Sequence, residues 1–402
     1  MKWEKVKLSE VTEYITDGDH QPAPKSDSGV LFVKIKDIQD NRLTFDNALF
    51  VPQEYYNRLP KNRKAEYGDT LYTVVGSYGI PAFVNHNIPF CFERNIALLH
   101  PNNRVIPKYL YYAVKNPIFY GNANNIANGS AQKLIPLSKL AGMEISVPPI
   151  ERQETIVNIL SDYDDLIENN QKQIKLLEEA AQRLYKEWFV DLRFPGHENT
   201  KIVDGIPEGW IEKTMGEVCD AIGGGTPSTK VDAYYRNGRI KWATPTDITR
   251  KNGLILLDTE KRITEEGLVH SSAKIVPPYT ILMTSRASVG FFGLCRHEIC
   301  TNQGFICCIP YKENYRFYLL YNLLNRVEEI RAKASGSTFL EISKKNFRTL
   351  RIILPSDVVL NLFTSQIQPM VKQMEVLTQA ITELQEARDR LLPKLMGGEI
   401  EV

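Results

Sequence analysis

The residue types that perform metal-dependent hydrolysis are present in this sequence, but not in their usual spacings. Neither Asp-x-Lys nor Glu-x-Lys occurs among the 402 residues, so the carboxylate–lysine metal site of many endonucleases is missing in its usual form. The six histidines include no HExxH pair, and the six cysteines include no CxxC pair. We therefore expect no catalytic residues and no metal site in this chain.

Two short motifs are only superficially similar to catalytic or cofactor-binding loops. Residues 116–119 (Asn-Pro-Ile-Phe) resemble the Asn-Pro-Pro-Phe/Tyr loop of amino-methyltransferases, but they lack its second proline and follow a predicted helix. We interpret them as a turn that ends this helix. Residues 223–225 (Gly-Gly-Gly) lack the spacing of a dinucleotide-binding loop and no Gly-Lys-Ser/Thr follows, so we predict a flexible loop base.

Composition sets broad limits on the architecture. A length of 402 residues with 43% hydrophobic residues predicts two to four domains with real cores. The net charge is +1, so any nucleic-acid-binding face must be a local patch. Because the six cysteines show no paired spacing, we expect buried, reduced thiols in a cytoplasmic protein. Because the N-terminus has no apolar core and no stretch reaches 18 apolar residues, we expect neither secretion nor a membrane span.

Two long helices organise the chain, the first over about residues 151–189 and the second over about 360–395. Alternating steps of four and three residues define a heptad pattern in each helix. In the first helix the pattern contains Ile156, Leu160, Tyr163, Ile167, Asn170, Ile174, Leu177, Ala181, Leu184 and Trp188. In the second it contains Phe363, Ile367, Met370, Met374, Leu377, Ile381, Leu384, Arg388, Leu391 and Leu395. We predict that the two apolar stripes pack on each other; the alternative is two unrelated helices on separate cores.

Two details modify this helix pair. Asn170 interrupts the first apolar stripe, where a buried polar residue can fix register, although a locally solvated position explains it equally well. Proline removes a backbone hydrogen bond and clashes with the preceding turn, so we predict a break or kink near Pro369.

An offset of 207 residues also aligns the rest of the chain with itself. Trp210, Met215, Glu217 and Val218 stand 207 residues after Trp3, Leu8, Glu10 and Val11, and Asn302, Ile352 and Pro355 stand 207 residues after Asn95, Ile145 and Pro148. The offset grows to 210 and 211 residues in between. This repeat predicts a duplicated globular domain plus helix, with approximate two-fold symmetry in one chain.

Local patterns within the first repeat indicate a mixture of strands and helices. Strands are predicted at residues 30–35, 70–75, 82–84, 96–99 and 143–147. A helix is predicted at 107–114, where Pro107 suits its first turn, and a polar loop at 122–130.

Several of these stretches together resemble the specificity subunits of type I restriction–modification enzymes. They are residues 188–197 (WFVDLRFPGH), 391–400 (LLPKLMGGEI) and 223–229 (GGGTPST), followed by Trp242 and Asp247–Ile248. The similarity covers essentially the whole chain, with Gly397 where the family usually has serine. It implies an α+β fold in which two α/β target-recognition domains are separated by two long helices forming an antiparallel coiled coil. The expected boundaries are 1–150 for the first domain, 151–190 for the first helix, 191–357 for the linker and second domain, and 358–402 for the second helix and tail.

The resemblance also implies partners. Each domain would recognise one half of a bipartite, asymmetric site on double-stranded DNA, and the coiled coil would hold the domains apart. Two methyltransferase subunits and two restriction/translocase subunits would complete the complex. These partners would carry S-adenosylmethionine, ATP and Mg, and this chain would bind no cofactor.

Contacts with DNA are expected from loops, where Arg, Lys and Gln suit base edges and phosphates and hydroxyl groups suit phosphates. The candidates in the first domain are Gln21, Lys34, Lys36, Tyr78, Gln132 and Lys133. Those in the second are Thr226, Ser228, Lys230, Thr246, Arg286, Ser288, Ser337 and Thr338. Arg286, which follows a predicted strand, is the strongest candidate for base recognition. Two alternatives remain open, a two-domain coiled-coil adaptor that binds proteins and a stand-alone DNA-binding regulator.

Overall fold

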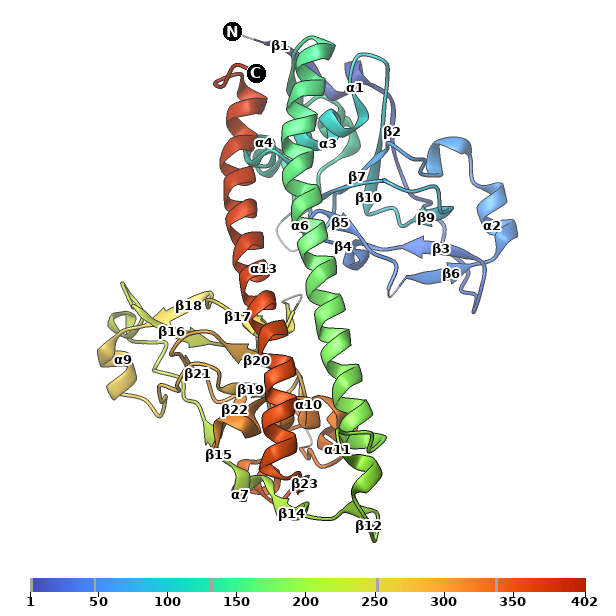
Figure 1. Ribbon diagram of the computed structural model, residues 1–402. Helices are drawn as coiled ribbons and strands as arrows, with labels where there is room; N and C mark the ends of the chain where they lie inside the picture. Colours follow the sequence, from blue (N-terminus) through green and yellow to red (C-terminus); the bar gives the residue numbers. More distant parts are fainter. Residues whose placement is uncertain (1–2, 47, 130–132, 251–252, 337–338) are drawn as a thin grey trace. The chain divides into compact units, whose positions relative to one another are not determined.

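The computed structural model describes residues 3–46, 48–129, 133–250, 253–336 and 339–402. The chain folds as two compact units, which we call unit 1 (Met1–Asp165 with Leu384–Val402) and unit 2 (Leu166–Glu383). The long helices α6 (Ile150–Tyr185) and α13 (Asp357–Gly397) each contribute a segment to both units, and Figure 1 shows α6 in green and α13 in orange to red. The predicted mixture of sheets and long helices is confirmed.

The described residues in the globular part of unit 1 form one four-stranded sheet, one three-stranded sheet and two strand pairs. Its strands are β1 (Glu4–Lys7), β2 (Thr12–Asp17), β3 (Val30–Val33), β4 (Ile38–Gln39), β5 (Arg42–Leu43), β6 (Leu49–Val51), β7 (Thr70–Thr73), β8 (Pro81–Phe83), β9 (Phe90–Phe92), β10 (Ile96–Pro101) and β11 (Glu144–Val147). Its helices are α1 (Leu8–Val11), α2 (Gln53–Arg58), α3 (Pro107–Lys115), α4 (Pro117–Ile126) and α5 (Leu137–Ala141). The strand orders are β1-β11, β2-β10-β7-β8, β6-β3-β9 and β4-β5.

Unit 2 repeats three of the four strand arrangements of unit 1. Its strands are β12 (Ile202–Val203), β13 (Ile206–Pro207), β14 (Ile211–Thr214), β15 (Cys219–Gly223), β16 (Ile240–Ala243), β17 (Ile255–Leu256), β18 (Lys261–Ile263), β19 (Ile281–Thr284), β20 (Phe292–Cys295), β21 (Cys300–Thr301), β22 (Phe305–Pro310) and β23 (Arg351–Leu354). Its helices are α7 (Met215–Val218), α8 (Pro245–Thr249), α9 (Glu265–Val269), α10 (Arg316–Asn325), α11 (Val327–Ala332) and α12 (Lys344–Arg348). The strand orders β14-β23, β15-β22-β19-β20-β17 and β18-β16-β21 repeat three of those in unit 1, with β17 added. Among the described residues, the β4-β5 pair has no counterpart in unit 2 and the β12-β13 pair has none in unit 1.

Individual hydrogen bonds repeat at the offset that the sequence predicts. The amide of Leu8 donates to the carbonyl of Met143 at 2.8 Å, and the amide of Met215 donates to that of Leu350 at 2.8 Å. Asp37 and Asp247, 210 residues apart, are both buried and accept a backbone N–H, from Lys34 at 2.9 Å and from Thr244 at 2.7 Å. The duplicated domain is therefore confirmed at the level of single contacts.

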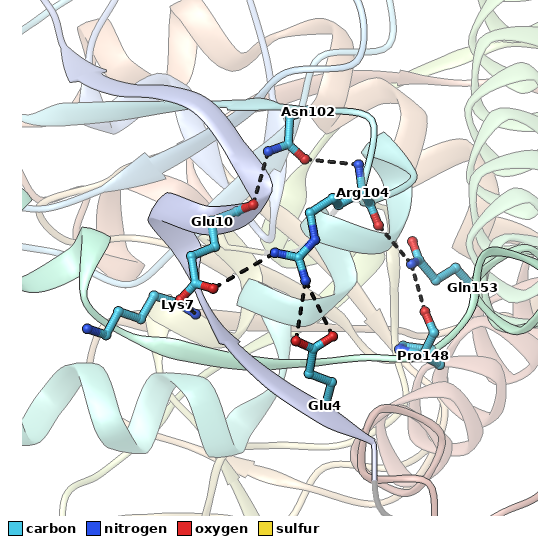
Figure 2. A network of polar contacts seen from close by, with 7 residues as sticks. All are labelled: Glu4, Lys7, Glu10, Asn102, Arg104, Pro148 and Gln153. Atoms are coloured by element: carbon cyan, nitrogen blue, oxygen red, sulfur yellow. Dashed lines mark hydrogen bonds and ion pairs between the residues drawn. The ribbon is translucent and has the colours of Figure 1, made fainter.

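A polar network connects the first turn of helix α6 to the segment before α3 and to the N-terminal residues of unit 1 (Figure 2). The fully buried amide of Gln153 donates to the carbonyls of Arg104 at 3.1 Å and Pro148 at 2.9 Å, and it accepts the N–H of Ile106 at 2.8 Å. The guanidinium of Arg104 reaches Glu4 at 3.3 Å and Glu10 at 3.8 Å. The first turn of α6 is thus fixed to the segment that precedes α3.

The predicted heptad positions fall on the inner faces of the helices within each unit. The buried ones are Ile156, Leu160, Ile167, Ile174, Ala181, Trp188, Phe363, Ile367, Met374, Leu377 and Leu395. The half-buried ones are Tyr163, Asn170, Leu177, Leu184, Met370, Ile381, Leu384, Arg388 and Leu391. In unit 1 the start of α6 packs with the end of α13, and in unit 2 the end of α6 packs with the start of α13, so the helices run antiparallel.

The buried face of α13 also includes positions next to the predicted stripe. Val371 and Leu392 are more deeply buried than their neighbours Met370 and Leu391. A straight α-helix drifts by about 20° per heptad, so a strict heptad pattern assigns some interface positions one residue early.

The prediction of a break near Pro369 is wrong, because α13 is continuous from Asp357 to Gly397. Pro369 lies on the exposed side of the helix, where water can satisfy the backbone carbonyl that loses its partner. Buried residues on both sides of it, Ile367 and Val371, hold the helix against the core of unit 2.

The interpretation of residues 116–130 also needs correction. Asn116 ends α3 but caps α4, since its side chain accepts the N–H of Ile118 at 3.0 Å, and Pro117 occupies the first helical turn. The predicted polar loop at 122–130 is therefore helical up to Ile126. Among the described residues, no helix combines the length and apolarity needed to cross a membrane.

Candidate nucleic-acid interface

A tight turn between β7 and β8 displays Tyr78 on the surface of unit 1. The amide of Gly79 donates to the carbonyl of Thr73 at 2.8 Å, and the Thr73 hydroxyl donates to the carbonyl of Ser77 at 2.8 Å. The same hydroxyl accepts the N–H of Ile80 at 2.9 Å. Gly79 has φ +84° and packs against the ring of Tyr120, so no side chain fits there.

Unit 2 contains the same turn between β19 and β20, with a different set of exposed side chains. Thr284 takes the place of Thr73, since its carbonyl accepts the N–H of Gly290 at 2.9 Å and its hydroxyl accepts that of Phe291 at 2.9 Å. The Thr284 hydroxyl also donates to the carbonyl of Ser288. This turn displays Arg286 and Ser288, both exposed.

A second segment lies against each turn. In unit 1 the carbonyl of Lys133 accepts the N–H of Gly76 at 3.0 Å, and in unit 2 the carbonyl of Leu340 accepts that of Ala287 at 2.9 Å. Arg286 and Glu341 form a β-bridge. Three predicted DNA contacts, Gln132, Ser337 and Thr338, lie outside the described residues.

The structure brings Tyr78 and Lys133 together in unit 1. The Lys133 ammonium donates to Oδ1 of Asn124 at 3.1 Å and lies 5.9 Å from the centre of the Tyr78 ring. The Tyr78 hydroxyl also donates to Asn124, and its ring stacks on that of Tyr120 at 6.2 Å. This turn cluster combines a cation with two stacked rings, which suits phosphate and base contacts.

Sequence reasoning missed Tyr120 and Asn124 because it ended the preceding helix at residue 114, interpreted residues 116–119 as a turn and placed residues 122–130 in a loop. The dipeptide Asn116-Pro117 was the available signal, since Asn is a favoured N-cap and Pro a favoured first helical residue.

In unit 2 the guanidinium of Arg286 faces a carboxylate. Its Nε lies 3.7 Å from Oε2 of Glu341, and the two side chains are 48% and 47% exposed. Such an exposed pair is weak, so Arg286 can exchange Glu341 for a DNA acceptor at little cost. Ala287 is held at φ +61°, where unit 1 has Gly76 at φ +69°. A non-glycine residue in this conformation is strained, and such strain is frequent at functional sites.

The other candidates of unit 1 come from different elements. Gln21 follows a loop in which Asp19 accepts bonds from Arg63 and Tyr55, both at 3.1 Å. Lys34 precedes the helical turn Ile35–Asp37 and Lys36 lies within it. This turn follows β3, which belongs to the β6-β3-β9 sheet and not to the sheet that displays Tyr78.

The glycine-rich segment of unit 2 is packed, which corrects the prediction of a flexible loop base. The amide of Gly225 donates to the carbonyl of Thr301 at 2.9 Å, and its carbonyl accepts Nε1–H of Trp242 at 3.0 Å. A Cβ on Gly224 would collide with the carbonyls of Thr301 and Asn302. The glycines therefore allow close approach of two backbones.

The candidates near this segment lie in two places. Thr226, Ser228 and Lys230 follow the glycines on an exposed surface, and the Thr226 hydroxyl donates to Gln303. Thr246 lies in α8, where its hydroxyl pairs with that of Thr244 at 2.7 Å.

Comparison with known proteins gives one consistent result. Residues 1–179 and 207–387 match the family described as "Type I restriction modification DNA specificity domain". The chain is 27% identical to the type I restriction enzyme MjaIX specificity subunit of Methanocaldococcus jannaschii, over 78% of this chain and 74% of that protein. It is 25% identical to the putative MjaX specificity subunit of the same organism, over 100% of this chain and 94% of the relative. The crystal structure of a type I system S subunit from M. genitalium has the same fold, with a TM-score of 0.58 at 17% identity, over 98% of this chain and 96% of that one.

Proposed function

Since this chain belongs to the type I restriction–modification DNA specificity family, we propose that it recognises a bipartite, asymmetric DNA site, with one half-site read by each unit. One observation carries this proposal. The turns Thr73–Ile80 and Thr284–Phe291 share their backbone hydrogen bonds but display different side chains, Tyr78 in the first and Arg286 in the second. One scaffold with two sets of contacts suits two unlike half-sites.

The chemistry of the displayed groups supports different roles. Arg286 can donate two hydrogen bonds to the O6 and N7 acceptors of guanine, the commonest specific contact in the major groove. Lys133 and the hydroxyl of Ser288 suit phosphate oxygens, which position the protein without reading sequence. Tyr78 and Tyr120 offer ring faces beside this cation.

We further propose that catalysis belongs to partner subunits. Two methyltransferase subunits would dock on the helices, and two restriction/translocase subunits would complete a cytoplasmic complex. In unit 2 a surface groove between α6 and α13 is lined by Leu176, Ala180, Leu184 and Met370, and it is flanked by Glu179 and Arg183. Leu176 is 63% exposed, which supports a protein partner on this face. S-adenosylmethionine, ATP and Mg would bind to the partners.

Sequencing of DNA methylation tests the proposal. Cells that contain this chain and an adenine methyltransferase partner are expected to methylate one bipartite motif, and deletion of the chain should abolish that methylation. Replacing residues 1–150 with the same region of a relative should change one half-site and leave the other intact. Methylation by the purified chain alone, or a change in both half-sites after the exchange, would contradict the proposal.

A further inference from the structure

The helix pair of unit 1 contains a layer of buried charges where its heptad pattern is otherwise apolar. Nη1 of Arg388 on α13 donates to Oδ1 of Asp164 on α6 at 2.7 Å. Lys115 of α3 lies 3.6 Å from the same oxygen, and the hydroxyl of Tyr112 donates to Oδ2 at 2.7 Å. Arg388 also pairs with Asp389 at 2.8 Å. We call Lys115, Asp164 and Arg388 the charged layer.

The charged layer is well shielded from water. The side chains of Lys115, Arg388 and Asp164 are 7%, 13% and 21% exposed. Burial lowers the pKa of Lys115 to about 8, although Asp164 opposes the shift. Burial alone would raise the pKa of Asp164, but Lys115, Tyr112 and Arg388 outweigh it and lower that pKa. The charges are therefore retained by mutual pairing in a place where an isolated charge would be costly.

The internal repeat supplies the comparison for this layer. Adding 207 to Asp164 gives Val371, subtracting 207 from Arg388 gives Ala181, and adding 207 to Lys115 gives Asn322. In unit 2, Ala181 and Val371 are fully buried in the apolar core, and Asn322 donates to the hydroxyl of Tyr185 at 2.9 Å. The same crossing of helices thus forms without charges at these three positions, so packing of the helices does not require them.

We propose that the charged layer makes α6 pair with α13 of its own chain and prevents each helix from pairing with its counterpart in a second copy. Because α6 and α13 are repeats, α6 could pair antiparallel with another α6. That arrangement would put each Asp164 opposite an Ala181 of the other chain. A pair of α13 helices would likewise put each Arg388 opposite a Val371.

Only pairing of α6 with α13 brings the two charges together. Either self-paired arrangement lacks the bond between Arg388 and Asp164. Each Asp164 would keep only Lys115 and Tyr112 of its own chain, and each Arg388 would keep only Asp389. Removing one partner from a buried ion pair disfavours the state that loses it. Single polar residues at such positions select partners in coiled coils in the same way. An asymmetric protein needs this selection, since self-pairing would join two identical recognition domains.

The apolar layer of unit 2 gives a matched design for the test. The variant K115N/D164V/R388A copies the repeat residues Asn322, Val371 and Ala181 into unit 1. We expect it to fold, with a denaturation midpoint close to that of the parent. After refolding at micromolar concentration, we expect it to form dimers, whereas the parent chain stays monomeric under the same conditions.

A single spin label shows whether such dimers pair through α6. Lys172 is exposed, and in a pair of α6 helices with the repeat's register the two copies of residue 172 lie at nearly the same level, next to the centre of the pair. The six native cysteines are buried, so the label attaches to the cysteine introduced by Lys172→Cys. Pulsed dipolar spectroscopy should give no interspin distance for the parent and a short one for the variant.

A second variant covers the case in which the first does not fold. K115Q/D164N/R388Q keeps the size and polarity of the layer but removes its charges, and it should also self-associate at least tenfold more tightly than the parent. Monomers without an interspin distance in every folded variant, at all concentrations, would overturn the proposal. Dimers without the label contact would overturn it too, because they would arise from another surface.

Discussion

The ion pair between Arg286 and Glu341 orients the guanidinium but is weak enough for Arg286 to exchange Glu341 for another acceptor. The pair is half exposed and separated by 3.7 Å, so it contributes between about 0 and 1 kcal/mol to folding. A bidentate contact to guanine is worth about 1–3 kcal/mol of discrimination. The larger value favours DNA as the final partner of this guanidinium.

Arg286→Ala is therefore expected to weaken or alter recognition of one half-site only, the one read by unit 2. Folding stability should change by less than about 1 kcal/mol. Binding to DNA libraries randomised in each half-site measures the effect. Arg351→Ala is a matched control, because Arg351 is also an exposed arginine of unit 2 paired with a glutamate, Glu212 at 3.3 Å. Equal losses at both half-sites would contradict the assignment.

Ala287 carries strain that unit 1 avoids with glycine. Its φ of +61° costs an L-residue about 1–2 kcal/mol, whereas Gly76 at φ +69° adopts the same region freely. Glycine also gains entropy in the unfolded state, so Ala287→Gly should stabilise unit 2 by at most about 1 kcal/mol. The reciprocal Gly76→Ala should destabilise unit 1 by a similar amount. Chemical denaturation measures both, and equal signs for the two substitutions would refute the strain.

Lys115 links stability to pH. Its pKa in the folded chain is about 8, below the ordinary 10.5, so the unfolded state binds more protons between these values. The free energy of unfolding should therefore rise with pH in this window, by at most about 1.4 kcal/mol per pH unit. Lys115→Met removes this contribution. Denaturation of both chains at pH 7.5 and 9.5 should show a larger gain, or a smaller loss, for the parent; parallel changes would rule out the depressed pKa.

At the scale of elements, helix α4 links a local capping rule to the candidate interface. Asn116 begins this helix, and α4 then presents Tyr120 and Asn124 to Tyr78. Asn116→Ala should cost about 1 kcal/mol of stability in unit 1, the usual value for an N-cap. Asn125→Ala, at an exposed position of the same helix, is the control and should be close to neutral. A neutral Asn116→Ala in thermal unfolding would show that the cap does not stabilise α4.

Structural features that are supported by many positions in the sequence were predicted well. The long helices follow from ten heptad positions each, and the duplication follows from anchors spread over both halves. The sequence predicted less well where tertiary context decides. Pro369 is tolerated because buried neighbours hold α13, and the glycines at 223–225 pack because Thr301 approaches their backbone.

The sequence indicated which residue types belong to the candidate interface, but it did not indicate which of these residues contact each other. Tyr78 and Lys133 were both proposed, yet nothing in their spacing indicated that Asn124 would bridge them. Likewise, Arg286 was identified from its place after a strand, but its partner Glu341 lies 55 positions away, in a segment without a periodic pattern. Long-range pairing of irregular segments depends on the packed fold, which local patterns do not encode.

At the scale of the whole molecule, the proposed function makes the helices a spacer whose length can be changed. The boundary between the units falls after Asp165 in α6 and after Glu383 in α13, so insertions there preserve the contacts within each unit. Seven residues added to each helix keep the apolar stripes in phase to within about 20°. They lengthen each helix by about 10 Å, which corresponds to about three base pairs of B-DNA. The methylated motif should then have a longer central spacer, by up to about three base pairs, with both half-sites unchanged.

Insertion of two residues in each helix rotates the stripes by about 200° and should abolish activity. An active seven-residue variant with the parental spacer would show that the helices do not set the distance, and that direct contact between the recognition domains does.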